Sequence, residues 1–322
     1  MIFQKIFDYF PPPKFLDLPF AGVSISDSHI RCMKFNKKSG GLSIEKYIEV
    51  DIPQGTVVSG QIINKEVLVQ VLQKLKKDLC LEYVKVSLPE EKAYLFTTKL
   101  PRVKMSEVQS AIESKMEENV PVSPSELLFD YKLIDHKTKE HLDVVVSAFP
   151  ITFIDTYVSL AQSASLILLS LEIESQAMLR ALLSENNQAT VLLAHFGKEK
   201  VGLYVVSRRV VRFTSTIPLK EERQEIPLFL SQEIKKLYMY WHTLKENVDV
   251  PERKIVQIIV CGENYGVEMV PFISAHNDTQ VVLGNVWTNV FDINKVVPEL
   301  SFNDSLRYAT AVGLALPADV LI

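Results

Sequence analysis

The sequence is poor in cysteine, and the few cysteines lack the pattern of a structural framework. Three occur in 322 residues, at Cys32, Cys80 and Cys261. Their odd number and wide separation argue against a paired disulfide framework, and no two of them have the short spacing of a zinc motif. We therefore expect all three to be free, buried thiols of a protein that folds in a reducing cytoplasm.

A basic excess is also missing. Lys and Arg number 35 against 39 Asp and Glu, which gives a formal net charge of -4. Proteins whose main partner is nucleic acid normally carry an excess of positive charge that neutralises phosphates. The charge balance therefore predicts no nucleic-acid partner.

Long apolar runs and short catalytic motifs are absent too. The most apolar long stretch, residues 151–173, is interrupted by Asp155, Gln162 and Glu172, so it falls short of the roughly 18 apolar residues of a membrane span. We expect no secretion signal, because no apolar core with a cleavage site opens the chain. Walker loops, nucleophile elbows and dinucleotide fingerprints are missing, and His136 and His141 have no third ligand nearby. No catalytic residue and no metal site is predicted.

The first ten residues carry an apolar pattern of their own. Five apolar side chains recur at helical spacing: Ile2, Phe3, Ile6, Phe7 and Phe10. Pro11–Pro13 would end any helix there, and a helix this short is marginal in water alone. Two interpretations stay open: a tail that packs on the body or on a neighbouring protein, and Met1–Phe10 as a foot that lies on a membrane surface.

Two longer stretches share one design. In Phe20–Phe35, apolar alternation leads into a small polar turn at Ser26–Ser28 and out again, which predicts a β-hairpin. Ala189–Phe213 repeats the pattern, with a strand that ends near His195 and Gly197 and a second strand that returns. One such hairpin in each half of the chain indicates an internally duplicated fold with a cleft between the halves.

The end of the chain carries a family resemblance. Gly284–Phe291 reads Gly-Asn-Val-Trp-Thr-Asn-Val-Phe, and Ser305–Leu316 reads Ser-Leu-Arg-Tyr-Ala-Thr-Ala-Val-Gly-Leu-Ala-Leu. These segments resemble the Asn-Val-Trp segment and the closing helix of the PilM family of type IV pilus assembly proteins, relatives of the division protein FtsA. The resemblance covers nearly everything after residue 20. It implies an α/β, actin-like fold, ribonuclease H-like and duplicated, with a small inserted α+β subdomain.

Family landmarks divide the chain. Lys99–Pro101, Glu118–Pro121 and Phe129–Tyr131 resemble parts of the inserted subdomain. After Ile217–Leu219 the usual glycine pair and two helices are missing, so a shortened second half is expected, with a linker at Lys220–Glu225. The expected units are an N-terminal tail (1–20), a first half (21–92 and 144–188), an inserted subdomain (93–143), a second half (189–303) and a C-terminal helix that returns to the first half (304–322).

The resemblance also implies a cleft for ATP and Mg²⁺ between the hairpin tips. The cleft positions in this chain are Ser26, Asp27, Arg31, Gly197 and Gly262. Arg31 replaces the family's usual lysine, Ser24 and His195 stand at its two aspartate positions, and Glu263 replaces a glycine. Mg²⁺ prefers carboxylate oxygens, so the loss of both aspartates removes its ligands. We interpret the cleft as degenerate, the protein as a pseudo-ATPase without a cofactor, and His195 as a side chain that fills vacated space.

The function implied by the resemblance is that of a non-catalytic cytoplasmic scaffold in a type IV pilus or type II secretion-like machine, peripheral at the inner membrane. The implied partner is the cytoplasmic tail of a PilN-type inner-membrane protein, held beside the inserted subdomain around Tyr94–Asp143 by strand addition or side-chain pockets. The pilus motor ATPase and further copies of this chain are also implied partners.

Two alternatives to this function stay open. One is an active actin-like ATP-binding assembly protein, which Ser24, His195 and Glu263 disfavour. The other is an FtsA-like division anchor, which ordinarily carries a C-terminal amphipathic membrane helix, whereas this chain ends at Leu321–Ile322, soon after its last predicted helix. The sequence does not distinguish which pilus or secretion system is served, the motif of the partner, or the oligomeric state.

Overall fold

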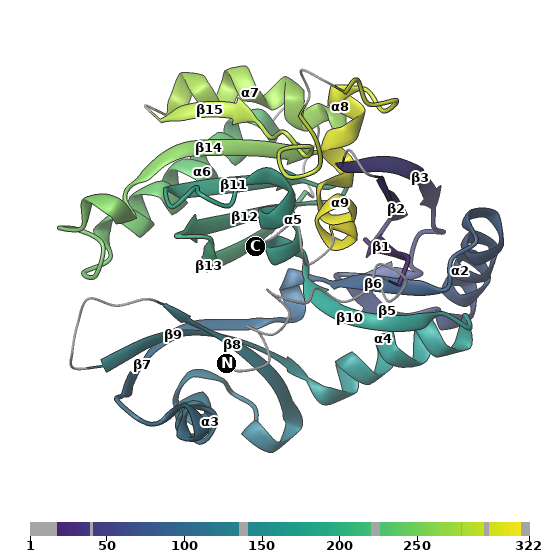
Figure 1. Cartoon of the computed structure of the whole chain (residues 1–322). Coiled ribbons are helices and arrows are strands. Elements are labelled where there is room, and N and C mark those ends of the chain that lie inside the picture. Colours follow the sequence, from purple (N-terminus) through teal and green to yellow (C-terminus); the bar gives the residue numbers. More distant parts are fainter. Residues whose placement is uncertain are drawn as a thin grey trace.

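The computed structural model describes residues 18–38, 41–134, 141–219, 226–277, 279–292 and 296–316. The predicted membrane foot Met1–Phe10, the linker Lys220–Glu225, His136 and the last residues Leu321–Ile322 lie outside this described part. Figure 1 shows two large sheets that meet around a central pair of helices, with a smaller sheet beside them.

The first large sheet starts with the predicted hairpin. β1 and β2 pair antiparallel, with Val23 opposite Cys32, and β3 continues the antiparallel run, whereas β6 and β10 lie parallel on the other side of β1. Apolar side chains of α2 and α4 cover one face and form one core with the sheet. The elements are β10 (Ile167–Ile173), β6 (Tyr83–Leu88), β1 (Phe20–Ile25), β2 (His29–Lys38), β3 (Gly41–Asp51), α2 (Lys65–Leu79) and α4 (Ile151–Ser163).

The second large sheet repeats this topology, as the paired hairpins predict. β11, β12 and β13 are antiparallel neighbours, and β14 and β15 lie parallel to β11 on its other side. Leu230, Ile234 and Leu237 of α6 and Met269 of α7 pack on one face. The elements are β13 (Val210–Pro218), β12 (Lys200–Ser207), β11 (Thr190–Phe196), β14 (Ile255–Gly262), β15 (Gln280–Leu283), α6 (Ile226–Thr243) and α7 (Asn264–His276).

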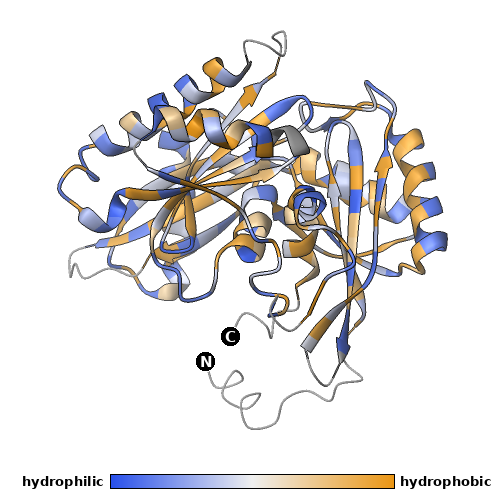
Figure 2. Cartoon of the chain, turned by 90° about the horizontal axis from the view of Figure 1, so that it is seen from above, coloured by the Kyte–Doolittle hydropathy of each residue, from blue (hydrophilic) through white to orange (hydrophobic). Residues whose placement is uncertain are grey.

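Small residues let the central helices approach the first sheet and each other. α5 (Glu174–Leu182) and α9 (Ala309–Ala315) pack together, and α9 also lies on β1 (Figure 1). A Cβ on Gly313 would lie 1.8 Å from the carbonyl oxygen of Ala177, and a Cβ on Gly22 would lie 2.2 Å from that of Ala311. Backbones this close leave no room for a side chain. In the view from above, hydrophobic residues recur along the strands and helices (Figure 2), and the buried core around α5 and α9 includes residues of both large sheets.

The last helix differs from the prediction. Instead of one helix over Ser305–Leu316, the chain forms α8 (Phe302–Ser305), a 3₁₀ turn at Leu306–Tyr308 and then α9. Ser301 caps the first piece, because its hydroxyl accepts a hydrogen bond from the Asp304 backbone. The tighter turn interrupts the continuous helix that the family resemblance implies.

The smaller sheet has the order β7-β9-β8 and carries helix α3 on one face. Ile112 and Met116 of α3 are fully buried against Leu100, Val144 and Val146. The elements are β7 (Tyr94–Pro101), α3 (Val108–Asn119), β8 (Leu127–Ile134) and β9 (His141–Pro150), with the 3₁₀ turns η3 (Met105–Glu107) before α3 and η4 (Pro124–Glu126) after it. Elsewhere in the molecule are the short strand pair β4 (Val57–Val58) and β5 (Gln61–Ile62) and the 3₁₀ turns η2 (Glu90–Lys92) and η5 (Pro251–Arg253).

The cysteine prediction is wrong at one position. Cys32 and Cys261 are buried free thiols, but Cys80 is exposed. It ends α2 with a φ of 50°, and its backbone N–H donates to the last carbonyls of the helix, a position that points its side chain to solvent. Across the residues that the structure describes, no helix is both long and apolar enough to cross a membrane.

Candidate functional site

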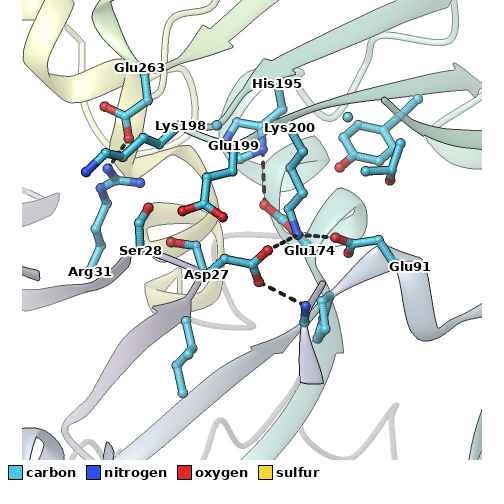
Figure 3. A pocket seen from close by; sticks show the side chains of 18 residues that line it. Asp27, Ser28, Arg31, Glu91, Glu174, His195, Lys198, Glu199, Lys200 and Glu263 are labelled. Carbon is cyan, nitrogen blue, oxygen red and sulfur yellow. Dashed lines mark hydrogen bonds and ion pairs between the residues drawn. The ribbon is translucent and has the colours of Figure 1, made fainter. Parts of the chain in front are cut away.

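The tips of the two hairpins meet at a small cavity between the halves of the molecule (Figure 3). Ser26, Asp27 and Arg31 of the first hairpin line one side, and Gly197 and Lys200 of the second line the other. The space left for solvent is about 30 Å³. A buried water needs about 10–15 Å³ by the same kind of measure, so this cavity has room for a few waters only.

The first tip uses its polar groups within its own half. The Ser26 N–H donates to the His29 carbonyl at 2.9 Å, which closes the turn. The buried Asp27 carboxylate accepts hydrogen bonds from the backbone of Gly60 at 2.9 Å and of Ser59 at 3.1 Å. Asp27 therefore points to the turn between β4 and β5, and these two hydrogen bonds take about half of the roughly four acceptor positions of a carboxylate.

Lys200 of the second half contacts carboxylates of the first half. It begins β12, and its ammonium forms an ion pair with Glu91 of η2 and lies 3.9 Å from Asp27 Oδ2 (Figure 3). Burial disfavours the charged ammonium, but the carboxylates of Glu174, Glu91 and Asp27 outweigh this and raise the pKa of Lys200 above its usual value. Lys200 is therefore charged at neutral pH.

His195 bridges the halves at a second point. Its Nδ1 lies 3.1 Å from Oε1 of Glu174, the first residue of α5, and both side chains are about one-seventh exposed, at 14% and 15%. Burial alone would raise the pKa of Glu174. The hydrogen bond from His195 and the charges of His195, Lys200 and Arg31 act against burial and lower it. Glu174 is thus a carboxylate held by partners from both halves.

Arg31 makes a third bridge. Its guanidinium pairs with Glu49 on the neighbouring strand β3 at 2.5 Å and with Glu263 of the second half, just after β14. Arg307 also reaches Glu49, at 3.3 Å. The Arg31 side chain is nearly buried, so these carboxylates rather than water balance its positive charge.

Four of the five predicted cleft residues line the cavity: Ser26, Asp27, Arg31 and Gly197. Gly262 is not among the lining residues. Its φ is +105°, and a Cβ there would lie 2.2 Å from the Phe196 carbonyl oxygen, so this glycine serves the close approach of β14 to β11. Of the four departures from the family pattern, Arg31, His195 and Glu263 line the cavity, and Ser24 does not.

The chain matches the model of one known protein family. The family model described as "Type IV pilus assembly protein PilM" matches residues 22–216, which is more than half of the chain. The chain belongs to the PilM family of type IV pilus assembly proteins. Curated proteins include no match to this PilM-family chain.

Solved structures confirm the predicted α/β, actin-like fold of this PilM-family protein. A structure described as a PilM–PilN type IV pilus biogenesis complex is similar with 15% identity and a TM-score of 0.78, over 95% of this chain and 99% of that one. The crystal structure of MreB5 of Spiroplasma citri bound to ADP is similar with 10% identity and a TM-score of 0.50, over 92% and 95% of the two chains. At these identities the likeness shows the fold alone.

The cavity of this PilM-family chain is lined by more acidic than basic side chains. Five acidic and three basic side chains line the cavity: Asp27, Glu91, Glu174, Glu199 and Glu263 against Arg31, Lys198 and Lys200. A triphosphate needs donors, and Mg²⁺ needs carboxylate oxygens that are free to bind it. Here the acidic excess repels phosphate, and Arg31, Lys200 or His195 contacts four of the five carboxylates. Among the described residues no group of three or more His, Cys, Asp or Glu is arranged to hold a metal ion.

Proposed function

We propose that this PilM-family protein is a non-catalytic scaffold of a type IV pilus or related secretion machine. Family membership supports the role in pilus assembly. The single observation that supports the non-catalytic part is the set of contacts that Arg31, His195 and Lys200 make with carboxylates across the cleft. These contacts leave about 30 Å³ where a nucleotide would have to bind. A cleft filled in this way holds the two halves together instead of performing phosphoryl chemistry.

The proposed partner is the cytoplasmic tail of a PilN-type inner-membrane protein. The similar solved structure is a PilM–PilN complex, which supports this choice. The proposed groove lies beside the inserted subdomain, residues 93–143. There β8 has one neighbouring strand, β9, in the described sheet, so its other edge offers backbone groups for strand addition. Leu128 on this strand is 57% exposed and would contact an apolar side chain of the tail.

Tail binding tests the proposal directly. Fluorescence anisotropy with a labelled PilN-type tail peptide compares the full-length chain with its Leu128→Glu variant, for which we expect an affinity about tenfold lower, the equivalent of about 1.4 kcal/mol. Met105→Glu is the matched control, because Met105 is an exposed apolar residue of the same subdomain, at 64%, outside β8. Equal binding by all three proteins would remove the proposed groove, and no binding by the unaltered chain would remove the partner.

The proposal includes a place for the protein at the inner membrane. In this proposal the protein works on the cytoplasmic face, beside the motor ATPase and other copies of itself, and Met1–Phe10 contacts lipid. Five apolar residues in this segment and the shortage of basic ones make the contact depend on apolar burial. Sedimentation with anionic vesicles after removal of residues 1–17 tests the contact, and unchanged sedimentation would exclude it.

A further inference from the structure

We propose that Lys200 is a built-in cation that joins the two halves of the cleft in the way a bound divalent ion would, so that the protein stays closed without a ligand. This inference rests on the proposal that the cleft is non-catalytic, and it adds which side chain holds the cleft closed. It does not depend on the PilN-type partner.

The position of Lys200 carries the argument. Asp27 and Glu91 belong to the first half, on the first hairpin turn and on η2, and both face the one ammonium of Lys200 from the second half. Lys200 is the residue whose carbonyl accepts the Gly197 N–H at 2.9 Å, so the turn that ends the second hairpin fixes its backbone. Two carboxylates from one half therefore share a cation that the other half holds rigidly.

Removing this ammonium would leave those carboxylates facing each other without a counterion. Side-chain exposures of 9% for Asp27 and 16% for Glu91 show how little water could replace it. Two nearby carboxylates with Glu174 behind them repel one another when all are ionised, and a hard divalent cation relieves that repulsion. The structure thus predicts that loss of Lys200 leaves Asp27 and Glu91 as a weak binding site for a divalent cation.

Two of the residues that depart from the family pattern take part in similar bridges. His195 stands at an aspartate position and pairs with Glu174 across the cleft, and Glu263 stands at a glycine position and pairs with Arg31. A decaying nucleotide site would lose side chains without regard to one another. Here each replacement contacts a polar or charged partner on the opposite half, which supports a cleft rebuilt for closure.

The test compares Lys200→Met with Lys198→Met in the full-length chain. Both lysines line the cavity and both variants lose one charge, but Lys198 forms no ion pair with the described carboxylates. With CaCl₂ as the probe, we expect Lys200→Met to bind Ca²⁺ with a Kd of about 1 mM by isothermal titration. Addition of 10 mM CaCl₂ should then raise its Tm by about 3 °C, with no rise for Lys198→Met or the unaltered chain.

A second variant and a second measurement decide the outcome if folding suffers. Adding Glu91→Gln to Lys200→Met should abolish the calcium response, because one of the two carboxylates is gone. If Lys200→Met folds only in the presence of Ca²⁺, as followed by circular dichroism, the proposal is supported. If Lys200→Met shows no calcium response in binding, melting or folding, or if Lys198→Met shows the same response, the proposal is overturned. Failure of the PilN-type tail to bind would leave this result unchanged.

Discussion

Two junctions in the molecule are built from different kinds of contact. At the layer of α5 and α9, Gly22, Gly313, Ala177 and Ala311 bring backbones into contact. At the cleft, Arg31, His195 and Lys200 meet carboxylates of the opposite half or strand. The first junction leaves no room for a side chain at Gly22 and Gly313, whereas charged and polar side chains form the second.

This difference separates the forces that act on the two junctions. Close apolar packing does not depend on salt or pH, and added volume is what damages it. Nearly buried ion pairs are costly to desolvate, so their net contribution is modest, but loss of one partner leaves an uncompensated charge. Volume changes should therefore break the first junction and charge changes the second.

The largest expected effect is at the packed junction. Gly313→Val places its Cβ 1.8 Å from the Ala177 carbonyl oxygen, a backbone atom that cannot move aside without shifting α5. We expect a loss of more than about 3 kcal/mol in the free energy of unfolding, measured by urea denaturation. Gly41→Ala is the control, because nothing lies within 4 Å of its Cβ and only its φ of +120° is strained, at about 1–2 kcal/mol. If Gly313→Val costs no more than the control, the close contact between α5 and α9 does not stabilise the fold.

Glu90 is a buried acid next to Glu91, and it differs from the paired acids of the cleft. It accepts hydrogen bonds from the backbone and the hydroxyl of Ser175. Burial raises its pKa to about 8, with the nearby charges of Glu174 and Glu91 acting in the same direction. The folded state thus keeps a proton that the unfolded state has lost. The free energy of unfolding should fall with rising pH between about 5 and 8, by up to about 1.4 kcal/mol per unit, and level off above.

Denaturation curves of Glu90→Gln across pH 5 to 9 measure this contribution. The variant should lose that part of the slope and be more stable than the unaltered chain at pH 9, because an amide keeps the acceptor for Ser175 without a charge. Glu66→Gln on the exposed face of α2 is the control and should leave the slope unchanged. A slope that survives in Glu90→Gln would place the titrating group elsewhere.

A smaller effect is expected at the charged junction. Arg31→Met leaves Glu263 without this partner and Glu49 with Arg307 alone. We expect a loss of about 2 kcal/mol at low salt, below the range for fully buried pairs because both acids are partly exposed. Adding Glu263→Gln should recover part of the loss in a double-mutant cycle. Lys34→Met, which breaks a pair with Glu45 between neighbouring strands, is the control and should cost under about 1 kcal/mol. No coupling between Arg31 and Glu263 would contradict the bridge.

The sequence predicts the local parts of this molecule well. The two hairpins follow from alternation and small polar turns within about twenty residues, and their repetition predicts the duplicated sheets. The closing helix is less well predicted, because the serine cap and the 3₁₀ turn at Leu306–Tyr308 interrupt a pattern that looks continuous. Cys80 was expected in the core, but the left-handed end of α2 turns it outward.

The charged network could be predicted only in part. Arg31, His195 and Glu263 stand out because they depart from the family pattern, yet the sequence does not reveal that Arg31 contacts Glu263. Glu91 and Lys200 carry no such signal, since they are 109 positions apart and meet only because η2 and the start of β12 are brought together by the fold. Pairing across halves depends on tertiary geometry, which periodicity does not encode.

Isothermal titration of Mg-ATP into the full-length chain tests the central claim most directly. A cleft closed by its own ion pairs predicts no saturable heat up to about 1 mM nucleotide. A micromolar Kd would show that the charges in the cleft yield to a nucleotide, and it would contradict the account of a scaffold held shut by its own side chains.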